Sequence, residues 1–421
     1  MERLPGFRDF YPEPLPDRDA WSAQVRQYVF ERWRAIARRY GFVEYDGPPL
    51  EPLELFTLKS GEEIVKQLFD FVDKGGRKVA LRPEMTPTLA RMVAAHQRNY
   101  KKPLKWFAIP QLFRYEKQQK GRLREHFQFN ADIIGEAGAA ADAELIALLI
   151  DTLRAFGLTE QDFVVRLSSR KVWEEFLEPK RAKLGLGPDQ VEAFYQAVDK
   201  LGRDTAAESQ SKLAALGLSL DEVNEFIHAA RPTAELQSIL ENLAARGLAA
   251  YVQIDYRIVR GLAYYTGPVY EAFDRKGEFR AIAGGGRYDN LIKLVSGGKI
   301  DLPALGFGMG DVVLVELLKA RGLVPKLDAG LDAFCIIEDE TLRSDTLRLV
   351  QRLRNAGLAV DYPLGETKPD KQIKRAHELG AKRTVKLERA ANGLLVRIRN
   401  LASREEKTGA PEQVETLVQA T

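Results

Sequence analysis

The sequence has almost no cysteine and little histidine. Cys335 is the only cysteine among 421 residues, which excludes an internal disulfide and a zinc site built from thiolates. The four histidines are scattered along the chain, which argues against a metal centre built from imidazole ligands. We therefore expect no metal site made by the protein alone.

Long hydrophobic runs are also missing. No apolar run approaches membrane-spanning length, and the first ten residues, MERLPGFRDF, lack the apolar stretch of a signal peptide. We expect a cytoplasmic protein with no membrane partner. The net charge is only +3, so a nucleic-acid surface would have to be a local patch rather than a field around the whole molecule.

The composition is otherwise that of an ordinary globular protein. With 421 residues, 45% of them hydrophobic, the chain is long enough for two or three domains with separate cores. No internal repeat or low-complexity segment is visible. The informative features are therefore local motifs.

The most informative stretch covers residues 113–134 and reads FRYEKQQKGRLREHFQFNADII. Polar and apolar residues alternate at both of its ends, as in two strands that each have one polar face. The middle contains a glycine and three basic residues, which predicts a loop between antiparallel strands. A face that carries Arg114, Glu116, Gln128 and Asp132 is poorly suited to a hydrophobic core, because such groups are buried only when paired.

From the residues alone, two interpretations of this face stay open. A solvated sheet face is the simpler one. Apolar neighbours such as Trp106, Ile133 and Ile134 instead indicate a central position, where the polar groups would meet a ligand. The stretch resembles motif 2 of the class II aminoacyl-tRNA synthetases, and most closely the histidyl-tRNA synthetases, in its FRxE arm, QKGRxR loop and acidic end. This resemblance favours a ligand site.

A second segment, residues 79–86 with the sequence VALRPEMT, predicts a strand that leads into a helix. Glu84 and Thr86 are two residues apart, so both side chains can point into one site. Thr86 and Pro87 are equally suited to begin the helix without a further role. The segment resembles RPExT of the histidyl family, which implies that Glu84, Met85 and Thr86 contribute to binding histidine, with the Glu and Thr holding its amino group.

The third segment spans residues 254–291 and contains three consecutive glycines at 284–286. A glycine run permits close approach of backbone to a ligand, although alone it is more often a plain turn. RGLAYYTG followed by GGGRYD resembles two motifs specific to the histidyl family. The resemblance implies that Arg260 bridges the histidine carboxylate and the α-phosphate of ATP, and that Tyr264 and Tyr265 line the imidazole pocket.

The chain departs from the family in two places. Residues 304–318, ALGFGMGDVVLVELL, predict a glycine-rich strand and an apolar helix, and resemble motif 3. The arginine with which motif 3 grips ATP is replaced by Val313, and Ala263 stands where the family commonly has aspartate. We interpret the chain as an active variant in which motif 2 and metal ions meet the triphosphate charge.

The other segments follow the family's domain order. Residues 21–39 predict a helix, and the strand and prolines after it weakly resemble motif 1, which implies a homodimer. Residues 174–247 predict short alanine-rich helices, either a plain spacer or the insertion that holds the acceptor end of tRNA in the family. From residue 325, alternating strands and helices predict a small mixed-sheet domain.

The C-terminal domain, residues 325–421, carries a concentration of basic residues with no matching acidic run. A solvated face explains it as simply as a track for RNA phosphates. Its position resembles the anticodon-binding domain of the class IIa synthetases, which favours RNA. The basic residues are Lys368, Lys371, Lys374, Arg375, Lys382, Arg383 and Lys386.

The resemblance covers essentially the whole chain and implies an α+β fold. Residues 1–324 would form the antiparallel catalytic core of a class II synthetase, flanked by helices and carrying the helical insertion. Residues 325–421 would form a mixed α/β anticodon-binding domain. The implied reaction joins L-histidine to tRNA(His) through a histidyl-adenylate made from ATP, with Mg²⁺ bound to the ATP. No nucleophilic side chain is needed, because such steps depend on positioning and on stabilising charge.

The resemblance also implies a role for each candidate residue. The catalytic cations are Arg114 and Arg260. Histidine is bound by Glu84, Met85, Thr86, Gln128, Asp132, Tyr264 and Tyr265. ATP is bound by Arg114, Glu116 and Arg122. Asp132 stands where many family members have glutamate, a longer side chain with the same charge.

Two other functions stay open. Val313 and Ala263 support a regulatory paralogue that keeps the histidine pocket, such as the regulatory subunit of ATP phosphoribosyltransferase. The retained Arg114 and Arg260, and the complete C-terminal domain, argue against it. An inactive synthetase-like RNA-binding module is the third candidate. Histidine-dependent exchange between ATP and pyrophosphate distinguishes the enzyme from both.

Overall fold

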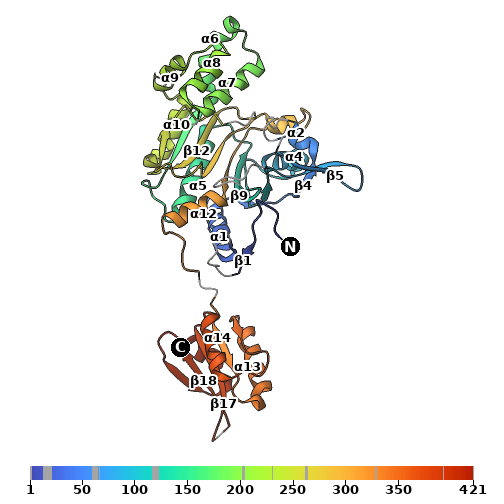
Figure 1. Cartoon of the computed structure of the whole chain (residues 1–421), viewed down its shortest axis with the longest axis vertical. Coiled ribbons are helices and arrows are strands. Elements are labelled where there is room, and N and C mark those ends of the chain that lie inside the picture. Colours follow the sequence, from blue (N-terminus) through green and yellow to red (C-terminus); the bar gives the residue numbers. More distant parts are fainter. Residues whose placement is uncertain are drawn as a thin grey trace. The chain divides into compact units, whose positions relative to one another are not determined.

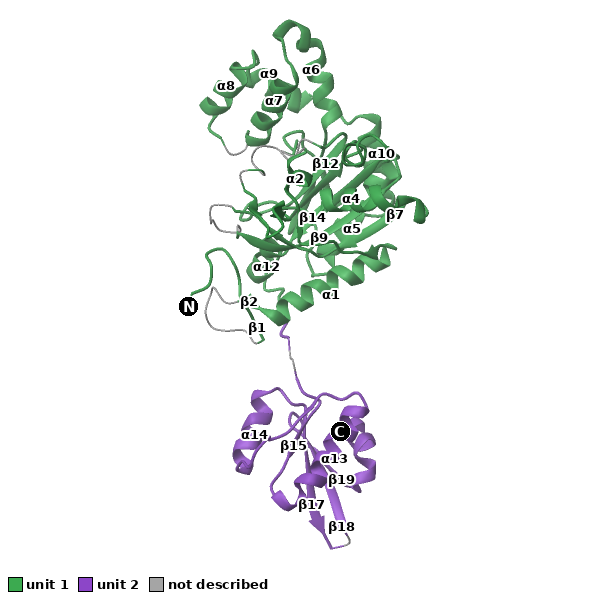
Figure 2. Cartoon of the chain, turned by 90° about the vertical axis from the view of Figure 1, so that its right-hand side faces the viewer, with its two compact units in different colours: residues 1–324 green, residues 325–421 purple. Residues whose placement is uncertain are grey.

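The chain divides into two compact units, residues 1–324 and 325–421 (Figures 1 and 2). The structure is a computed structural model that describes residues 2–12, 21–58, 65, 67–115, 123–201, 204–229, 231–260, 264–327, 330–391 and 393–420. Within these ranges, no helix combines the length and the apolar character needed to cross a membrane.

A nine-stranded sheet forms the centre of the first unit. Its strands, in spatial order, are β11 (Val252–Ile254), β10 (Phe163–Ser169), β12 (Pro268–Asp274), β13 (Ala283–Arg287), β14 (Ala304–Gly310), β9 (Glu125–Ile134), β7 (Leu104–Ala108) and β3 (Val43–Glu44), with β8 (Gln111–Phe113) paired to the start of β9. All pairs are antiparallel except the outermost ones, β11 with β10 and β3 with β7. The predicted α+β class with an antiparallel core is confirmed.

Helices cover both faces of this sheet. The larger hydrophobic core includes side chains from α1 (Ala23–Arg39), α5 (Ala139–Arg154), α10 (Ala234–Ala245) and α12 (Asp311–Ala320). The smaller core includes side chains from α4 (Thr86–His96) and α11 (Leu291–Val295). Phe129, Ala131 and Ile133 of β9 belong to the larger core and Ile134 to the smaller one, as the alternation predicted. Gln128 and Asp132 therefore face the same side as Ile134.

The segment around Glu84 follows a smaller antiparallel sheet. Its order is β4 (Leu50–Pro52), β6 (Lys78–Leu81) and β5 (Phe69–Val72), with α2 (Leu53–Thr57) beside it. The chain passes from β6 into α4, as VALRPEMT predicted. Shorter elements are the parallel pair β1 (Phe10–Tyr11) and β2 (Trp21–Ser22), and the 3₁₀ turns Gln97–Asn99 and Ala249–Tyr251.

Four helices gather at one end of the first unit, at the top of Figure 1. They are α6 (Arg170–Leu184), α7 (Pro188–Lys200), α8 (Ala206–Ala214) and α9 (Leu220–Ala229). Rings of Trp173, Phe176, Phe194 and Phe226 pack against one another between them. α10, which lies within the range predicted for the insertion, packs against α5 of the sheet core instead.

The second unit is a five-stranded mixed sheet with helices on both faces. Its elements are β15 (Ala333–Ile336), α13 (Arg343–Asn355), β16 (Val360–Asp361), α14 (Pro369–Glu378), β17 (Arg383–Ala390), β18 (Gly393–Asn400), β19 (Glu406–Gly409) and α15 (Val414–Ala420), with 3₁₀ turns at Glu340–Leu342 and Pro411–Gln413. The strand order is β16-β15-β17-β18-β19. The first three strands are parallel and the last three antiparallel.

Several of the basic residues of this unit have acidic partners, although no acidic run matches them in sequence. Lys382 pairs with Asp332 at 2.8 Å, and Lys386 lies between Glu338 and Glu388. Asp332 and Glu338 are distant from these lysines in sequence, whereas Glu388 lies two residues after Lys386.

Candidate active site

Glycines form the floor of the candidate site. In the sheet, Gly284 pairs with Gly308, and Gly286 pairs with Gly306. A Cβ on Gly284 would overlap the guanidinium of Arg260, and one on Gly306 would overlap the carboxylate of Asp132. The glycines of GGGRYD and of the motif 3 strand therefore make room for functional side chains above the sheet.

Asp132 is a buried carboxylate with one oxygen engaged. The hydroxyl of Tyr288 donates to its Oδ1 at 2.6 Å, while Oδ2 is buried with no hydrogen-bond partner among the described residues. Burial raises the pKa of Asp132 to about 7, against the lowering effect of the Tyr288 hydrogen bond. The site thus holds an oriented acceptor that can still take a hydrogen bond.

Glu84 is held in the same way. The hydroxyl of Tyr264 donates to its Oε2 at 2.7 Å, and its Oε1 is buried without a partner among the described residues. Burial raises the pKa of Glu84 as well. The ring of Tyr264 contacts those of Tyr265 and Tyr288, with centroids 5.2 and 6.0 Å apart. Glu84, Asp132, Tyr264, Tyr265 and Tyr288 are from here on called the tyrosine-carboxylate cluster.

Two predicted histidine-binding residues, Met85 and Thr86, directly follow Glu84. Met85 is fully buried, and its sulfur lies 3.8 Å from a guanidinium nitrogen of Arg82. Thr86 is the first residue of α4, as the plain helix-start interpretation also expected, and the N-cap residue before it, Met85, makes no side-chain cap bond.

Arg260 combines a strained backbone with a charged partner. Its φ is +54°, in the left-handed region that residues other than glycine seldom adopt, at a cost of roughly 1–3 kcal/mol. Its guanidinium forms an ion pair with Glu271, the residue that pairs across the sheet with Gly284. Burial acts to lower the pKa of Arg260, but interactions with Tyr265 and Glu271 outweigh it and keep the guanidinium charged.

A cavity of about 810 Å³ opens beside these residues. Its walls include Gln128, Gly284, Gly308 and Val313, and two residues of α7, Val198 and Asp199. The described residues that line it include the arginines Arg114, Arg166, Arg257, Arg260 and Arg280. The Nε of Arg114 donates to the carbonyl of Pro83 at 2.9 Å, which links motif 2 to the RPEMT segment. Glu116 and Arg122, also predicted to bind ATP, lie outside the described residues.

His126 also lines this cavity. Burial, and then the positive charges of Arg114 and Arg8, lower its pKa to about 3. Its ring is therefore neutral near pH 7 and adds no charge to the arginine-lined wall.

A buried ion cluster that the sequence did not predict lies behind the motif 3 helix, α12. Arg8 donates to Glu125 at 2.6 Å and to Asp311 at 2.8 Å, and all three side chains are buried. Asp311 also accepts from the backbone N–H of Phe127 at 3.0 Å. The sequence feature that could have indicated this cluster is the presence of Glu125 and Asp311 at the starts of two apolar elements. Buried carboxylates of this kind require a cation nearby. This cluster fixes the start of α12, beside Val313.

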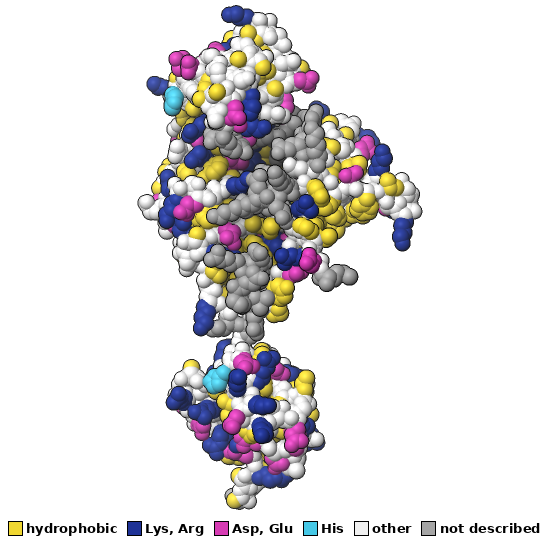
Figure 3. Space-filling model, in the orientation of Figure 1, with side chains coloured by type: hydrophobic (Ala, Val, Ile, Leu, Met, Phe, Trp, Pro, Cys, Tyr) yellow, Lys and Arg dark blue, Asp and Glu magenta, His cyan; other side chains and the backbone are white. Residues whose placement is uncertain are grey.

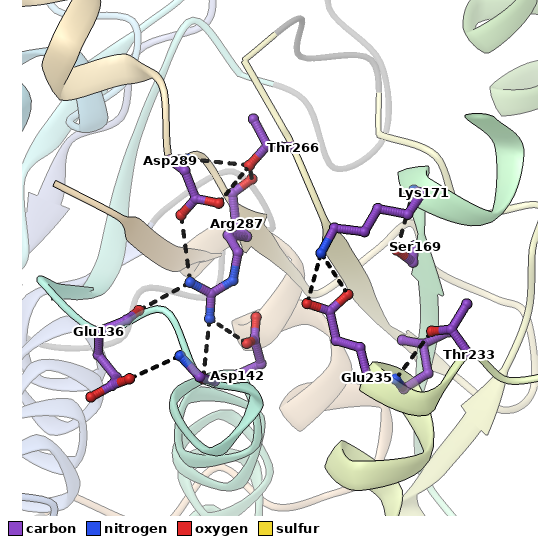
Figure 4. A network of polar contacts seen from close by, with 11 residues as sticks. Glu136, Asp142, Ser169, Lys171, Thr233, Glu235, Thr266, Arg287 and Asp289 are labelled. Carbon is purple, nitrogen blue, oxygen red and sulfur yellow. Dashed lines mark hydrogen bonds and ion pairs between the residues drawn. The ribbon is translucent and has the colours of Figure 1, made fainter. Parts of the chain in front are cut away.

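GGGRYD has two further roles that the sequence interpretation did not assign. Arg287 reaches the start of α5, donating to Asp142 at 2.5 Å and to the carbonyl of Glu136 at 3.0 Å (Figure 4). Asp289 accepts from Thr266 at 3.1 Å. These bonds fix the chain on both sides of Tyr288, the donor to Asp132.

Comparison with known proteins agrees with this geometry. The family model described as histidyl-tRNA synthetase matches residues 15–310. The chain belongs to the histidyl-tRNA synthetase family. A histidine–tRNA ligase of Opitutus terrae is 46% identical over 444 residues, which cover 99% of this chain and 98% of that protein. The match therefore includes the C-terminal unit of this synthetase-family chain.

Solved structures share the fold. The histidyl-tRNA synthetase of Nostoc sp. PCC 7120 superposes with a TM-score of 0.75 at 22% identity, covering 97% of each chain. A Bacillus halodurans protein described as an ATP phosphoribosyltransferase regulatory subunit/histidyl-tRNA synthetase gives 0.70 at 22% identity, covering 89% of this chain and 96% of its own. Because the synthetases and the regulatory subunits share this fold, the fold alone does not separate the two functions.

Proposed function

We propose that this member of the histidyl-tRNA synthetase family is an active histidine–tRNA ligase. It would form histidyl-adenylate from L-histidine and ATP, and then transfer the histidyl group to tRNA(His). The observation that carries the proposal is the tyrosine-carboxylate cluster, which lies next to an arginine-lined cavity. It holds two buried, oriented carboxylate oxygens that have no partner among the residues the structure describes. Such a pair of acceptors suits a ligand with two N–H groups some distance apart.

Histidine has that arrangement of donors. The imidazole N–H would donate to Oδ2 of Asp132, whose other oxygen Tyr288 holds in place. The amino group would donate to Oε1 of Glu84, steadied by Tyr264. Met85, Thr86, Gln128 and Tyr265 would complete the pocket walls. A ligand lacking the ring N–H would leave Asp132 unpaired, which penalises its binding.

The first chemical step would depend on two arginines. Arg114 would hold the α-phosphate and Arg260 would lie between that phosphate and the histidine carboxylate, orienting the attack and stabilising the charge that develops on phosphate oxygens. The Glu271 ion pair keeps the guanidinium of Arg260 over Gly284. Glu116 and Arg122 would contact the ATP from the motif 2 loop.

Other arginines can replace the positive charge that Val313 does not supply. Arg166 and Arg257 line the same cavity and share one carboxylate, that of Asp255, at 3.4 and 2.8 Å. This wall therefore keeps positive charge to meet the triphosphate. Mg²⁺ would enter with ATP and neutralise phosphate oxygens. In the part of the chain that the structure describes, two acidic side chains line the cavity, Glu271 and Asp199, so phosphate and water oxygens would supply most of the Mg²⁺ ligands.

The remaining partners follow from the same proposal. The second unit would bind the anticodon end of tRNA(His), and α6–α9 its acceptor end. A homodimer would cover the apolar side chains that gather over β4 and β5, on the right of the first unit in Figure 3. Among them, Phe71 is 50% exposed and Val72 is 61% exposed. The protein would work in the cytoplasm.

Histidine-dependent ATP–pyrophosphate exchange tests the proposal. The unaltered protein should catalyse exchange with histidine and not with other amino acids, and Arg114→Gln should abolish it while leaving histidine binding measurable. Val313 and Ala263 favour the regulatory paralogue as a second candidate, which would bind histidine without exchange. Histidine binding with no exchange in the unaltered protein would therefore replace the enzyme proposal by the paralogue.

A further inference from the structure

Arg170 is a buried arginine that neither the motifs nor the proposed chemistry uses. It is the first residue of α6 and only 5% exposed. From the geometry we infer that Arg170 is a positioning residue for adenylate formation, which holds the strained main chain of Arg260 and couples it to α6 and α7. This inference rests on the proposed function, because it assumes that Arg260 acts on the substrate.

The contacts of Arg170 converge on the segment that ends at Arg260. Its Nη2 donates to the carbonyl of Arg260 at 2.7 Å, and its Nε donates to the carbonyl of Val259 at 3.3 Å. Its backbone N–H donates to the carbonyl of Gly267 at 3.1 Å. One residue thus holds main chain on both sides of residues 261–263.

A second side chain of α6 also holds the main chain that leads to Arg260. Trp173 lies three residues after Arg170, on the same side of the helix, and its Nε1 donates to the carbonyl of Tyr256 at 2.9 Å. One face of α6 therefore fixes carbonyls along residues 256–260, directly before the left-handed turn at Arg260.

The strain at Arg260 is what makes these bonds necessary. A left-handed φ at a residue with a side chain persists only when surrounding contacts hold it. Without a donor at position 170, two carbonyls would lose their bonds, and the backbone could relax toward the ordinary right-handed region. That rotation would redirect the side chain of Arg260 away from Glu271 and the floor at Gly284.

The start of α6 is itself anchored on two sides. Its next residue, Lys171, pairs with Glu235 of α10 at 3.0 Å, and its N–H is capped by Ser169 at 3.3 Å (Figure 4). On the other side, the guanidinium of Arg170 stacks on the ring of Tyr195 in α7, 4.7 Å from its centroid. Arg170 thereby links the position of the helical group α6–α9 to the main chain of Arg260.

The test uses the full chain and separates kcat from KM. Arg170→Met removes the donors but keeps an unbranched side chain, and should lower kcat of histidine-dependent pyrophosphate exchange about a hundredfold. The KM for histidine should change less than about threefold, because Glu84 and Asp132 keep their tyrosine partners. Arg170→Lys, which keeps one donor, should restore part of kcat. Lys183→Met, at an exposed position of the same helix, is the matched control, and should leave both constants unchanged.

Tyr195 supplies a milder variant that retains every hydrogen bond of Arg170. Tyr195→Leu removes the stacking surface and should lower kcat roughly three- to tenfold, whereas Tyr195→Phe keeps the ring and should have no effect. An unchanged kcat in Arg170→Met and Tyr195→Leu would overturn the inference, as would a KM for histidine that rises in step with the fall in kcat. Absence of exchange in the unaltered protein would instead overturn the proposed function, and this inference with it.

Discussion

The two compact units differ in where they keep their charged residues. Among the described residues, the buried polar side chains of the second unit are Thr346, Gln372 and Thr384, none of them charged. Those of the first unit include the charged residues Arg8, Glu84, Glu125, Asp132, Asp142, Arg170, Asp255, Arg287 and Asp311. The acid–base pairs of the second unit, such as Lys382 with Asp332, lie at its surface instead.

This difference indicates which unit carries out chemistry. Removing a charge from water costs several kcal/mol even when it is paired. Buried charges therefore indicate places where a site requires them in spite of that cost. Fixed charges in a water-poor setting are what recognition of a small charged substrate requires. Surface charges that water still reaches suit contacts with a large polyanion, whose attraction to them depends on salt.

The largest effect should come from separating the two units. A chain that ends at Val324 should keep histidine-dependent pyrophosphate exchange within about threefold, but charge tRNA(His) roughly a hundredfold more slowly, because the phosphate contacts of the second unit are lost. Both half-reactions are measured on the truncated and full chains over a range of salt. An equal loss of both would mean that the second unit supports the first structurally, and the division of labour would fail.

The next largest effect should come from the buried acceptor of the first unit. Asp132→Ala leaves the imidazole N–H unpaired, a loss of about 1.5–3 kcal/mol, or roughly ten- to a hundredfold in histidine affinity. The Michaelis constants for histidine and ATP in pyrophosphate exchange measure it. The constant for ATP should change much less, since Arg114 is untouched. If both constants rise together, Asp132 is a structural residue.

Local pattern was enough to predict the elements that surround the site. The alternation in β9, the strand-to-helix passage at Glu84 and the glycine-rich β14 all appear where the sequence indicated them, whereas β13 forms a strand where the glycine run alone suggested a turn. These signals succeed because polarity and glycine content report which face of a strand a residue occupies and how closely its neighbours approach.

Partners from distant parts of the chain could not be predicted in this way. Arg8 meets Glu125 across 117 positions and Asp311 across 303. Arg170 reaches the carbonyl of Arg260 across 90 positions. Asp332, the acidic partner of Lys382, lies 50 positions away and could not be predicted for the same reason. A charge pattern shows that a group needs a partner, but only the fold determines which residue provides it.

A smaller effect is expected at the departure from motif 3. If the arginines of the cavity already meet the triphosphate, Val313→Arg should change the KM for ATP by less than about threefold, because the added charge duplicates charge already present. Val313→Leu is the matched control for side-chain size. The KM for ATP in both variants is compared with that of the unaltered protein. Exchange that appears only in Val313→Arg would show that the missing arginine is essential and would favour the regulatory paralogue.

The smallest effect should be on how the stability of the fold depends on pH, and here too the two units should differ. Burial raises the pKa values of Asp132 and Asp142 in the first unit, to about 7 and about 6. In the second unit, hydrogen bonds from Lys382 and Thr341 lower those of Asp332 and Asp339. An acid with a raised folded-state pKa contributes stability that is fully present below its unfolded-state pKa, and that stability is lost as pH rises from there through the raised value.

Asp132→Asn isolates this contribution, since asparagine keeps the shape and the acceptor for Tyr288 but does not titrate. At pH 5.5 the folded Asp132 is protonated while the unfolded carboxyl is already ionised, so the variant should already unfold at a somewhat higher temperature. At pH 8 the unaltered protein also carries a buried charge in the folded state, so the gap should be wider by at least about 2 °C. Calorimetry of both proteins at the two pH values measures the gap. A gap that is the same at both would mean that Asp132 is already ionised at pH 5.5, and that its burial costs less than the structure indicates.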